Sequence, residues 1–204
     1  MKLVFDFGGV LFRWRPLVVI QQCLPTRAVD QDSAAHWADQ VFQSYGGDWG
    51  EFDRGTVTVP ELVERIAQRT GLQAAEVQAV VDAVPLELQA KPDSVALLRR
   101  LRDAGRPLYY LSNMPEPYAL HLEAANDFLA WFSDGVFSAR VHANKPEPAI
   151  FGIASERFGA KPQELLLLDD HGPNVTAARA AGWQALHFTD AAATQMQLQQ
   201  LGIM

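Results

Sequence analysis

Short apolar runs that end in polar residues or glycines recur along the chain. Residues 3–5 are all apolar and are followed at once by Asp6 and then by Gly8 and Gly9. An apolar run of this length that stops at glycine is typical of a strand buried on both faces, followed by a sharp turn. Similar runs predict four further strands, over residues 107–111, 135–138, 165–168 and 184–188.

Helical patterns separate these strands from Pro92 onward. Apolar residues at helical spacing begin after Pro92 and stop at Gly105, and later helices are predicted over 116–125, 127–132, 146–158, 174–181 and 190–201. Alternation of strand and helix is typical of a parallel sheet covered by helices on both faces. The sequence therefore predicts an α/β fold with a Rossmann-like, doubly wound parallel sheet.

The segment from about 16 to 91 has a different rhythm and is helical almost throughout. Thr58 with Glu61 forms a capping-box pattern that starts one helix, and another is predicted over 76–84, closed by Pro85. This block is far longer than a crossover between parallel strands requires. We expect it to be an inserted unit, which gives a discontinuous core of residues 1–15 and 92–204 and a helical unit of residues 16–91.

Two local features of this block lead to specific expectations. Gly46, Gly47 and Gly50 should interrupt the helical pattern. The charged side chains near its end and in the next helix should lie on solvated helix surface: Glu87, Lys91, Arg99 and Arg100.

Composition narrows the class of protein. The 204 residues are 49% hydrophobic and carry a formal net charge of −7, which disfavours binding to nucleic acid or to an anionic membrane. The single cysteine, Cys23, cannot form an internal disulfide. No apolar run approaches the roughly 20 residues that span a bilayer, and Asp6 and Arg13 interrupt the apolar run near the N-terminus. We expect a soluble cytoplasmic protein, either monomer or homodimer.

Four polar clusters fall at or just after the ends of the predicted strands. In a parallel sheet these carboxyl ends meet at one edge, where such folds bind ligands. Carboxylates can bind Mg²⁺, a hydroxyl and a lysine can hold a phosphoryl group, and one carboxylate can attack phosphorus. The clusters are Asp6 with Gly8, Ser112 with Asn113, Lys145, and Asp169 with Asp170.

The order of these clusters resembles the haloacid dehalogenase-like hydrolase superfamily, most of whose members are Mg²⁺-dependent phosphatases with an aspartate nucleophile. Four motifs carry the resemblance: FDFGGVL (5–11), LSN (111–113), NKPEPAIF (144–151) and LLLDDHGPNVTAARAAGW (166–183). The resemblance implies that residues 16–91 form a helical cap over the site, with hinges near Arg15 and Lys91. It also implies a small phosphorylated molecule as substrate.

The resemblance assigns a role to each matching residue. Asp6 corresponds to the nucleophile and a metal ligand, and Lys145 to the lysine that neutralises the charge of the nucleophile and the phosphoryl group. The remaining matches are Gly8, whose carbonyl would bind the metal; Ser112 and Asn113 at the phosphate; Asp170 as direct Mg²⁺ ligand; Asp169 behind it, orienting Lys145; and Asn174 at the phosphate or the water bound to the metal.

Gly8 departs from the family pattern, in which a second aspartate usually serves as general acid and base. Such help is worth roughly 10²–10⁴-fold in rate. The glycine form resembles a subgroup that includes α-glucose-1-phosphate phosphatases, which suggests a sugar 1-phosphate as substrate. His171 could replace the missing acid, or it could only help its loop to turn.

Two other functions remain open from the sequence. A 2-haloacid dehalogenase would use the same Asp6 without metal, and a binding module could have lost catalysis; Gly8 disfavours the first and motivates the second. Arg13, Trp14 and Arg15 either contact the substrate or form an exposed hairpin. Packing is the favoured role for two aromatics of the helical block, Trp49 and Phe52.

Overall fold

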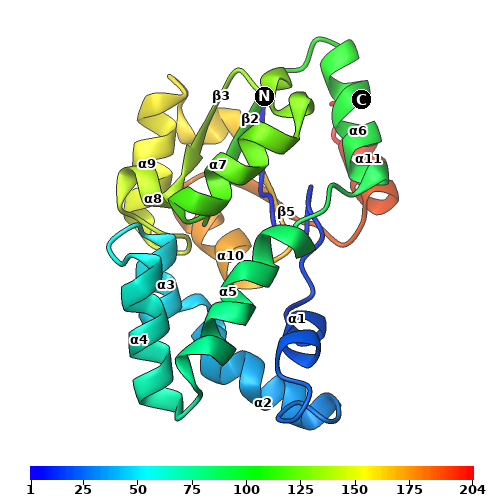
Figure 1. The fold of residues 1–204 in the computed structure, drawn as a ribbon. Coiled ribbons are helices and arrows are strands. Elements are labelled where there is room, and N and C mark those ends of the chain that lie inside the picture. The colour runs from blue at the N-terminus through cyan, green and yellow to red at the C-terminus, as the bar shows by residue number, and fades with distance from the viewer.

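A five-stranded parallel sheet forms the centre of the computed structural model, which describes residues 1–204 (Figure 1). The strand order is β3-β2-β1-β4-β5, so the chain winds in both directions from β1. This is the predicted α/β class, with each strand bound shifted by at most one residue: β1 Lys2–Phe5, β2 Leu108–Ser112, β3 Asp134–Phe137, β4 Leu165–Asp169 and β5 Gln184–His187.

The central strands are apolar throughout because helices cover both faces of the sheet. In β4, Leu166 and Leu168 join one buried cluster, whereas Leu165 and Leu167 join the other, as the two-residue period of a strand requires. Helices α6 (Pro92–Asp103), α7 (Glu116–Ala125) and α11 (Ala191–Gln200) contribute to the first cluster. Helices α9 (Pro148–Arg157) and α10 (Gly172–Ala180) contribute to the second. The short helix α8 (Ser138–Val141) follows β3.

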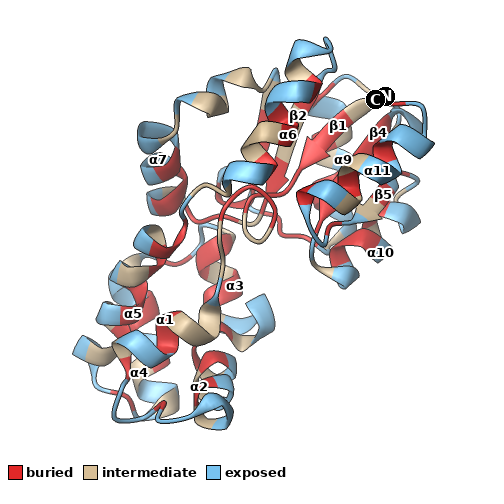
Figure 2. Ribbon diagram, turned by 90° about the vertical axis from the view of Figure 1, so that its right-hand side faces the viewer, coloured by how far each residue is buried: buried red, intermediate tan, exposed pale blue.

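Five helices gather beyond the carboxyl ends of the strands, below the sheet in Figure 1. They are α1 (Pro16–Cys23), α2 (Gln31–Phe42), α3 (Gly47–Asp53), α4 (Val59–Thr70) and α5 (Ala74–Glu87). The larger buried cluster, of 41 residues, extends from the sheet into this block. Figure 2 shows buried residues both in the strands and on the helices of the block. None of the helices combines the length and apolar composition needed to cross a bilayer.

One expectation about helix limits in this block is confirmed in part, and another is wrong. The helical pattern is interrupted between the end of α2 at Phe42 and the start of α3 at Gly47, with Gly46 as the extended N-cap. Gly50, however, lies inside α3, where an added Cβ would lie 2.8 Å from the carbonyl oxygen of Tyr45, so glycine permits a close backbone approach. Pro85 does not end α5, which continues to Glu87. A proline leaves the carbonyl four residues earlier without its helical donor, and here the Tyr118 hydroxyl donates to that carbonyl, of Val81, at 2.8 Å.

The expectation that Glu87 lies on solvated surface is also wrong. Its carboxylate is 5% exposed and accepts hydrogen bonds from Arg13 at 3.0 Å and from Arg15 at 2.8 and 2.9 Å. The hydrogen bonds from Arg15 first, and Arg13 in addition, hold the pKa of Glu87 below its usual range. These contacts hold together the two segments that join the helical block to the sheet, near Arg15 and near Lys91. The Lys91 ammonium likewise donates to the carbonyl of Gly9.

Candidate active site

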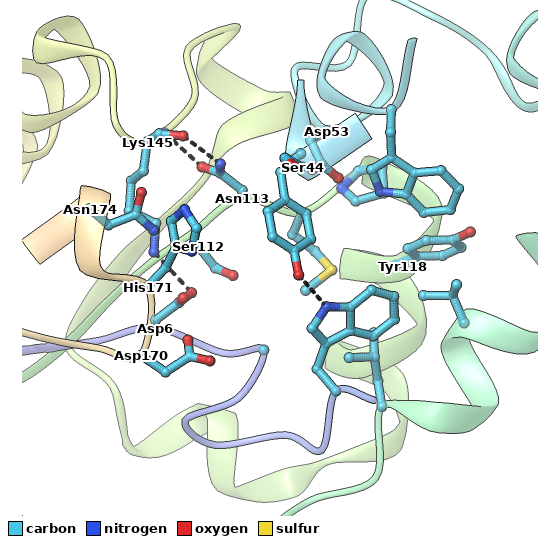
Figure 3. A pocket seen from close by; sticks show the side chains of 18 of the residues that line it. Asp6, Ser44, Asp53, Ser112, Asn113, Tyr118, Lys145, Asp170, His171 and Asn174 are labelled. Atoms are coloured by element: carbon cyan, nitrogen blue, oxygen red, sulfur yellow. Dashed lines mark hydrogen bonds and ion pairs between the residues drawn. The ribbon is translucent and has the colours of Figure 1, made fainter. Parts of the chain in front are cut away.

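A pocket opens where the carboxyl ends of the strands face the helical block (Figure 3). Of the site residues expected from sequence, only Asp169 does not line it, because that side chain is fully buried behind the wall. The residues that the fold brings together at the pocket are Asp6, Gly8, Ser112, Asn113, Lys145, Asp170, His171 and Asn174.

Asp6 follows β1 directly, and its position is fixed by the sheet. Its backbone N–H donates to the carbonyl of Leu168 at 3.0 Å. One side-chain oxygen, Oδ1, accepts from the backbone N–H of Phe7 at 2.7 Å and lies 3.0 Å from the Lys145 ammonium. Burial raises the pKa of Asp6 to about 7, although Lys145 opposes the shift. The other oxygen, Oδ2, makes no hydrogen bond within the protein, so Asp6 has an oxygen available for nucleophilic attack.

Lys145 is a buried cation held between two carboxylates. Its ammonium lies 2.5 Å from Asp169 and 3.0 Å from Asp6. Burial alone would lower the pKa of Lys145, but the charges of Asp169 and Asp6 outweigh burial and raise it. Lys145 is therefore charged at neutral pH, and its ammonium lies beside the Asp6 carboxylate.

Ser112 and Asn113, at the end of β2, have different surroundings. The hydroxyl of Ser112 is almost fully buried, lines the pocket and makes no hydrogen bond within the protein. The Asn113 amide is occupied on both sides: Nδ2 donates to the Lys145 carbonyl at 2.8 Å, and Oδ1 accepts from the Lys145 N–H at 2.7 Å. Asn113 thus positions the backbone of Lys145, and Ser112 has a hydroxyl to offer a ligand.

The acidic residues suit a hard cation such as Mg²⁺. Carboxylate oxygens of Asp6, Asp169 and Asp170 lie within 4.8 Å of one another. Both oxygens of Asp169 accept hydrogen bonds, from Lys145, Asn174 and the backbone of His171. The carboxylate of Asp170 makes no side-chain hydrogen bond, and desolvation first and the charge of Asp169 second raise its pKa.

An unpartnered oxygen beside this cluster supports the same fit. Asn174 donates through Nδ2 to both oxygens of Asp169 at 3.1 Å, which leaves its own Oδ1 buried without a partner. A buried acceptor without a donor is unfavourable. A bound cation with its water, or a phosphate proton, would satisfy it.

The opposite wall of the pocket is mainly aromatic and apolar. The Trp14 indole N–H donates to the Tyr45 hydroxyl at 2.9 Å, and the Tyr45 ring meets the His171 ring edge-on at 5.7 Å. Trp14 therefore faces the pocket, while its neighbours Arg13 and Arg15 pair with Glu87. The rest of this wall comes from Trp49, Val84, Leu88, Met114, Pro115 and Tyr118.

Asp53, at the end of α3, is an acidic pocket residue that sequence reasoning missed, as it missed Tyr45 and Tyr118. It is 5% exposed and lines the pocket. Phe52, the residue before it, is buried as expected. An acid directly after a buried aromatic and two residues before Gly55 was the available signal.

Comparison with known proteins agrees with this geometry. Residues 3–182 match the family model described as haloacid dehalogenase-like hydrolase. The chain belongs to this family. It is thus a hydrolase, as the four motifs predict.

Relatives and solved structures resemble the hydrolase over different lengths. A sesquiterpene phosphatase of Aspergillus oryzae is 29% identical over 199 residues, which cover 97% of this chain and 94% of the relative. A phosphoglycolate phosphatase of Escherichia coli is 32% identical over 98 residues, 48% of this chain and 39% of the relative. A HAD family enzyme of Bacteroides thetaiotaomicron, solved with magnesium and inorganic phosphate, shares the fold with a TM-score of 0.73 at 21% identity, covering 95% of this chain and 98% of that one.

Proposed function

We propose that the hydrolase is a Mg²⁺-dependent phosphomonoesterase that works through a phosphoryl group carried on Asp6. The observation that carries the proposal is the convergence of Asp6, Lys145, Ser112 and Asp170 on one pocket. The two phosphatase relatives support the same reaction class.

The residues of the sheet edge supply the steps of the reaction. A carboxylate oxygen of Asp6 attacks phosphorus, and the bond from phosphorus to the leaving oxygen breaks with its electron pair going to that oxygen. Lys145 neutralises charge on the phosphoryl oxygens, and Ser112 donates a hydrogen bond to one of them. Water then attacks the same phosphorus atom, and the electron pair of the Asp6–phosphorus bond returns to Asp6.

Asp6, the carbonyl of Gly8 and Asp170 are the proposed Mg²⁺ ligands. Bound there, Mg²⁺ would draw negative charge from the phosphoryl oxygens and help to orient the phosphoryl group for attack. Asp169 stays behind these ligands and orients Lys145, while Asn113 holds the backbone of the same lysine.

The proposed division of the chain follows the two linkers. Residues 1–15 and 92–204 form the catalytic core, and residues 16–91 form a cap that covers the pocket. The cap would exclude water from the reacting phosphoryl group and supply the surface that receives the alcohol part of the substrate.

Two classes of alcohol are candidates for the substrate. A sugar 1-phosphate fits the missing acid at Gly8, because its leaving oxygen is less basic than that of an ordinary alcohol. The wall of the pocket favours an apolar alcohol instead: the Tyr45 and Tyr118 hydroxyls are already hydrogen-bonded, and few groups remain for sugar hydroxyls. The sesquiterpene phosphatase relative is consistent with an apolar alcohol.

An assay with three phosphate monoesters tests this proposal: a hexose 1-phosphate, a short alkyl phosphate and a prenyl phosphate, each with Mg²⁺ and with EDTA. We expect turnover with Mg²⁺ only, higher kcat/KM for the prenyl ester, and none for Asp6→Asn, while Asp103→Asn on the far end of α6 stays active. The proposal is contradicted if none of the three esters is hydrolysed, or if the activity survives EDTA. Chloride release from a 2-chloroacid without metal would favour the dehalogenase alternative.

A further inference from the structure

The buried carboxyl of Asp53 has no hydrogen-bond partner within the protein, although it lies on the wall of the pocket. Burying an unpaired carboxyl is costly, and such groups cluster at functional sites. Figure 3 shows Asp53 on the side of the pocket formed by α3, across from Asp6 and Asp170. The carboxyl therefore faces the space that a substrate would occupy.

The end of α3 is fastened to the core, so this position is well defined. The Ser138 hydroxyl donates to the carbonyl of Asp53 at 2.5 Å and accepts from the backbone N–H of Met114 at 2.8 Å. Ser138 is fully buried, and Met114 follows the Ser112–Asn113 loop. One hydroxyl thus links Asp53 to the loop proposed to bind phosphate.

Two further contacts hold the same helix against the core. The Asn144 side chain donates to the carbonyl of Gly50 at 2.7 Å. Arg54 pairs with Glu147, which follows the Lys145 loop. Although α3 belongs to the helical block, it is docked directly beside the catalytic loops.

We propose that Asp53 is the general acid and base of the reaction and takes the place that Gly8 leaves vacant. This inference rests on the proposed phosphatase function. It assigns to the helical block a catalytic residue as well as the binding of the alcohol.

The surroundings of Asp53 favour the protonated form that a general acid needs. Burial first, and the charge of Asp6 second, raise the pKa of Asp53 to about 8. Its charged neighbour Arg54 is paired with Glu147, so no cation of the helix opposes the shift. The other titratable groups that face the same pocket are Tyr45, Tyr118, Lys145, Asp170 and His171.

The proton transfers balance over the two steps. As the bond from phosphorus to the leaving oxygen breaks, the Asp53 carboxyl gives its proton to that oxygen and the neutral alcohol departs. The resulting Asp53 carboxylate then takes a proton from the water that attacks the phosphoryl group on Asp6. Phosphate is released and Asp53 is protonated again.

Leaving-group dependence of the purified enzyme tests this role. We compare Asp53→Asn with Asp48→Asn, a matched change on the same helix at a residue that pairs with Arg69 outside the pocket. The substrates are an alkyl phosphate, whose leaving oxygen needs a proton, and 4-nitrophenyl phosphate, whose leaving oxygen does not.

For Asp53→Asn we expect kcat/KM for the alkyl ester to fall by roughly 10²–10⁴-fold, with little change for the nitrophenyl ester. Quenched samples with the nitrophenyl ester should accumulate phosphorylated enzyme, because the water step has lost its base. The fall of the wild-type kcat/KM for the alkyl ester above about pH 8 should also disappear. Asp48→Asn should behave like the wild type.

Thermal unfolding distinguishes a catalytic from a structural role. The pKa of Asp53 is higher in the folded state than in the unfolded state, so between about pH 4 and pH 8 the group ionises in the unfolded chain only. The free energy of unfolding therefore falls as pH rises through this range. Asp53→Asn, which cannot ionise, should therefore unfold at a higher temperature than the wild type at pH 9 and at a similar temperature at pH 4.

The assignment of Asp53 would be overturned if Asp53→Asn lost kcat/KM equally on both esters, or if its ratio of kcat/KM between the two esters matched that of the wild type. The phosphatase proposal would stand in both cases. If His171→Asn instead loses activity on the alkyl ester alone, His171 would be the general acid and base. If the wild type hydrolyses neither ester, the phosphatase proposal itself fails, and this inference with it.

Discussion

The two walls of the pocket differ in how their polar groups are satisfied. On the wall formed at the ends of the strands, here called the sheet wall, Lys145 lies between Asp6 and Asp169. Asn113 and Asn174 hold these groups in place. On the opposite wall, here called the helical wall, aromatic side chains line the pocket together with one carboxyl, Asp53, that has no hydrogen-bond partner. The sheet wall is therefore organised before substrate arrives, as phosphoryl transfer requires. The helical wall is suited to receive the alcohol and to exchange a proton with it.

The backbone shows the same contrast. Gln43, Ser44 and Tyr45 are consecutive non-glycine residues with left-handed φ values of 48°, 50° and 67°, a conformation that costs about 1–2 kcal/mol per residue. Tyr45 is held over the pocket by Trp14 and the ring of His171. The strain sits in a segment that lines the pocket through Ser44 and Tyr45, and not in the strand that leads to Asp6.

The largest effect should follow from breaking the charge balance of the sheet wall. Lys145→Met leaves Asp6 and Asp169 as buried carboxylates without their cation, and this should destabilise the fold by about 3–5 kcal/mol at neutral pH. The loss should shrink near pH 4, because burial raises the pKa of Asp6 and its carboxyl is protonated there. Urea unfolding at both pH values measures it. A variant as stable as the wild type at pH 7 would contradict the account of this wall.

A second comparison uses two adjacent glycines. At Gly9, φ is +75° and an added Cβ would lie 2.0 Å from Oδ2 of Asp170, whereas at Gly8 the nearest atom, of Trp14, is 3.9 Å away. Gly9→Ala should displace Asp170 and abolish Mg²⁺-dependent activity, and Gly8→Ala should keep the fold and the activity. Calorimetric titration with Mg²⁺ and the ester assay distinguish them. Equal behaviour of both variants would show that Gly9 is not needed for the acidic site.

The room at Gly8 also allows the family's usual acid to be restored. Gly8→Asp should fold, and in the Asp53→Asn background it should recover part of the activity on the alkyl phosphate. The alkyl-to-nitrophenyl ratio of kcat/KM measures the recovery. No recovery in a correctly folded double variant would mean that the two positions do not serve the same proton transfer.

The smallest effect concerns the tyrosine of the strained segment. Tyr45→Phe removes the acceptor of the Trp14 indole but keeps the ring over His171, and a single hydrogen bond of this kind contributes about 0.5–1.5 kcal/mol. We expect KM to rise a few-fold with kcat nearly unchanged. A large fall in kcat would instead place the Tyr45 hydroxyl in the chemistry.

The sequence predicted the sheet wall well because strand ends are local signals whose convergence follows from topology. Asp6, Ser112 and Asp169 lie at or directly after apolar runs, so a parallel sheet brings them to one edge without any knowledge of packing. Lys145 is predicted at the same edge because it lies in the loops beyond β3, whereas Asn174, in α10, comes from the family motifs alone. The specific hydrogen bonds of Asn113 to Lys145 could not be derived from spacing alone.

The helical wall was harder to predict because its features depend on contacts across the chain. Glu87 has the sequence context of a surface residue and is buried by two arginines more than 70 positions away. Pro85 stays inside its helix because Tyr118 supplies the missing donor. Asp53 becomes a pocket residue only when Ser138 and Asn144 dock its helix on the core. None of these tertiary contacts has a periodic pattern.

The central claim is that Asp6 carries a phosphoryl group in turnover, and rapid-quench mass spectrometry of the enzyme with substrate and Mg²⁺ tests it most directly. The account predicts one phosphoryl group on the peptide that contains Asp6, cleaved by hydroxylamine, absent in Asp6→Asn and more abundant in Asp53→Asn. An active enzyme that shows no phosphorylated peptide in any variant, or one phosphorylated at another residue, would contradict it.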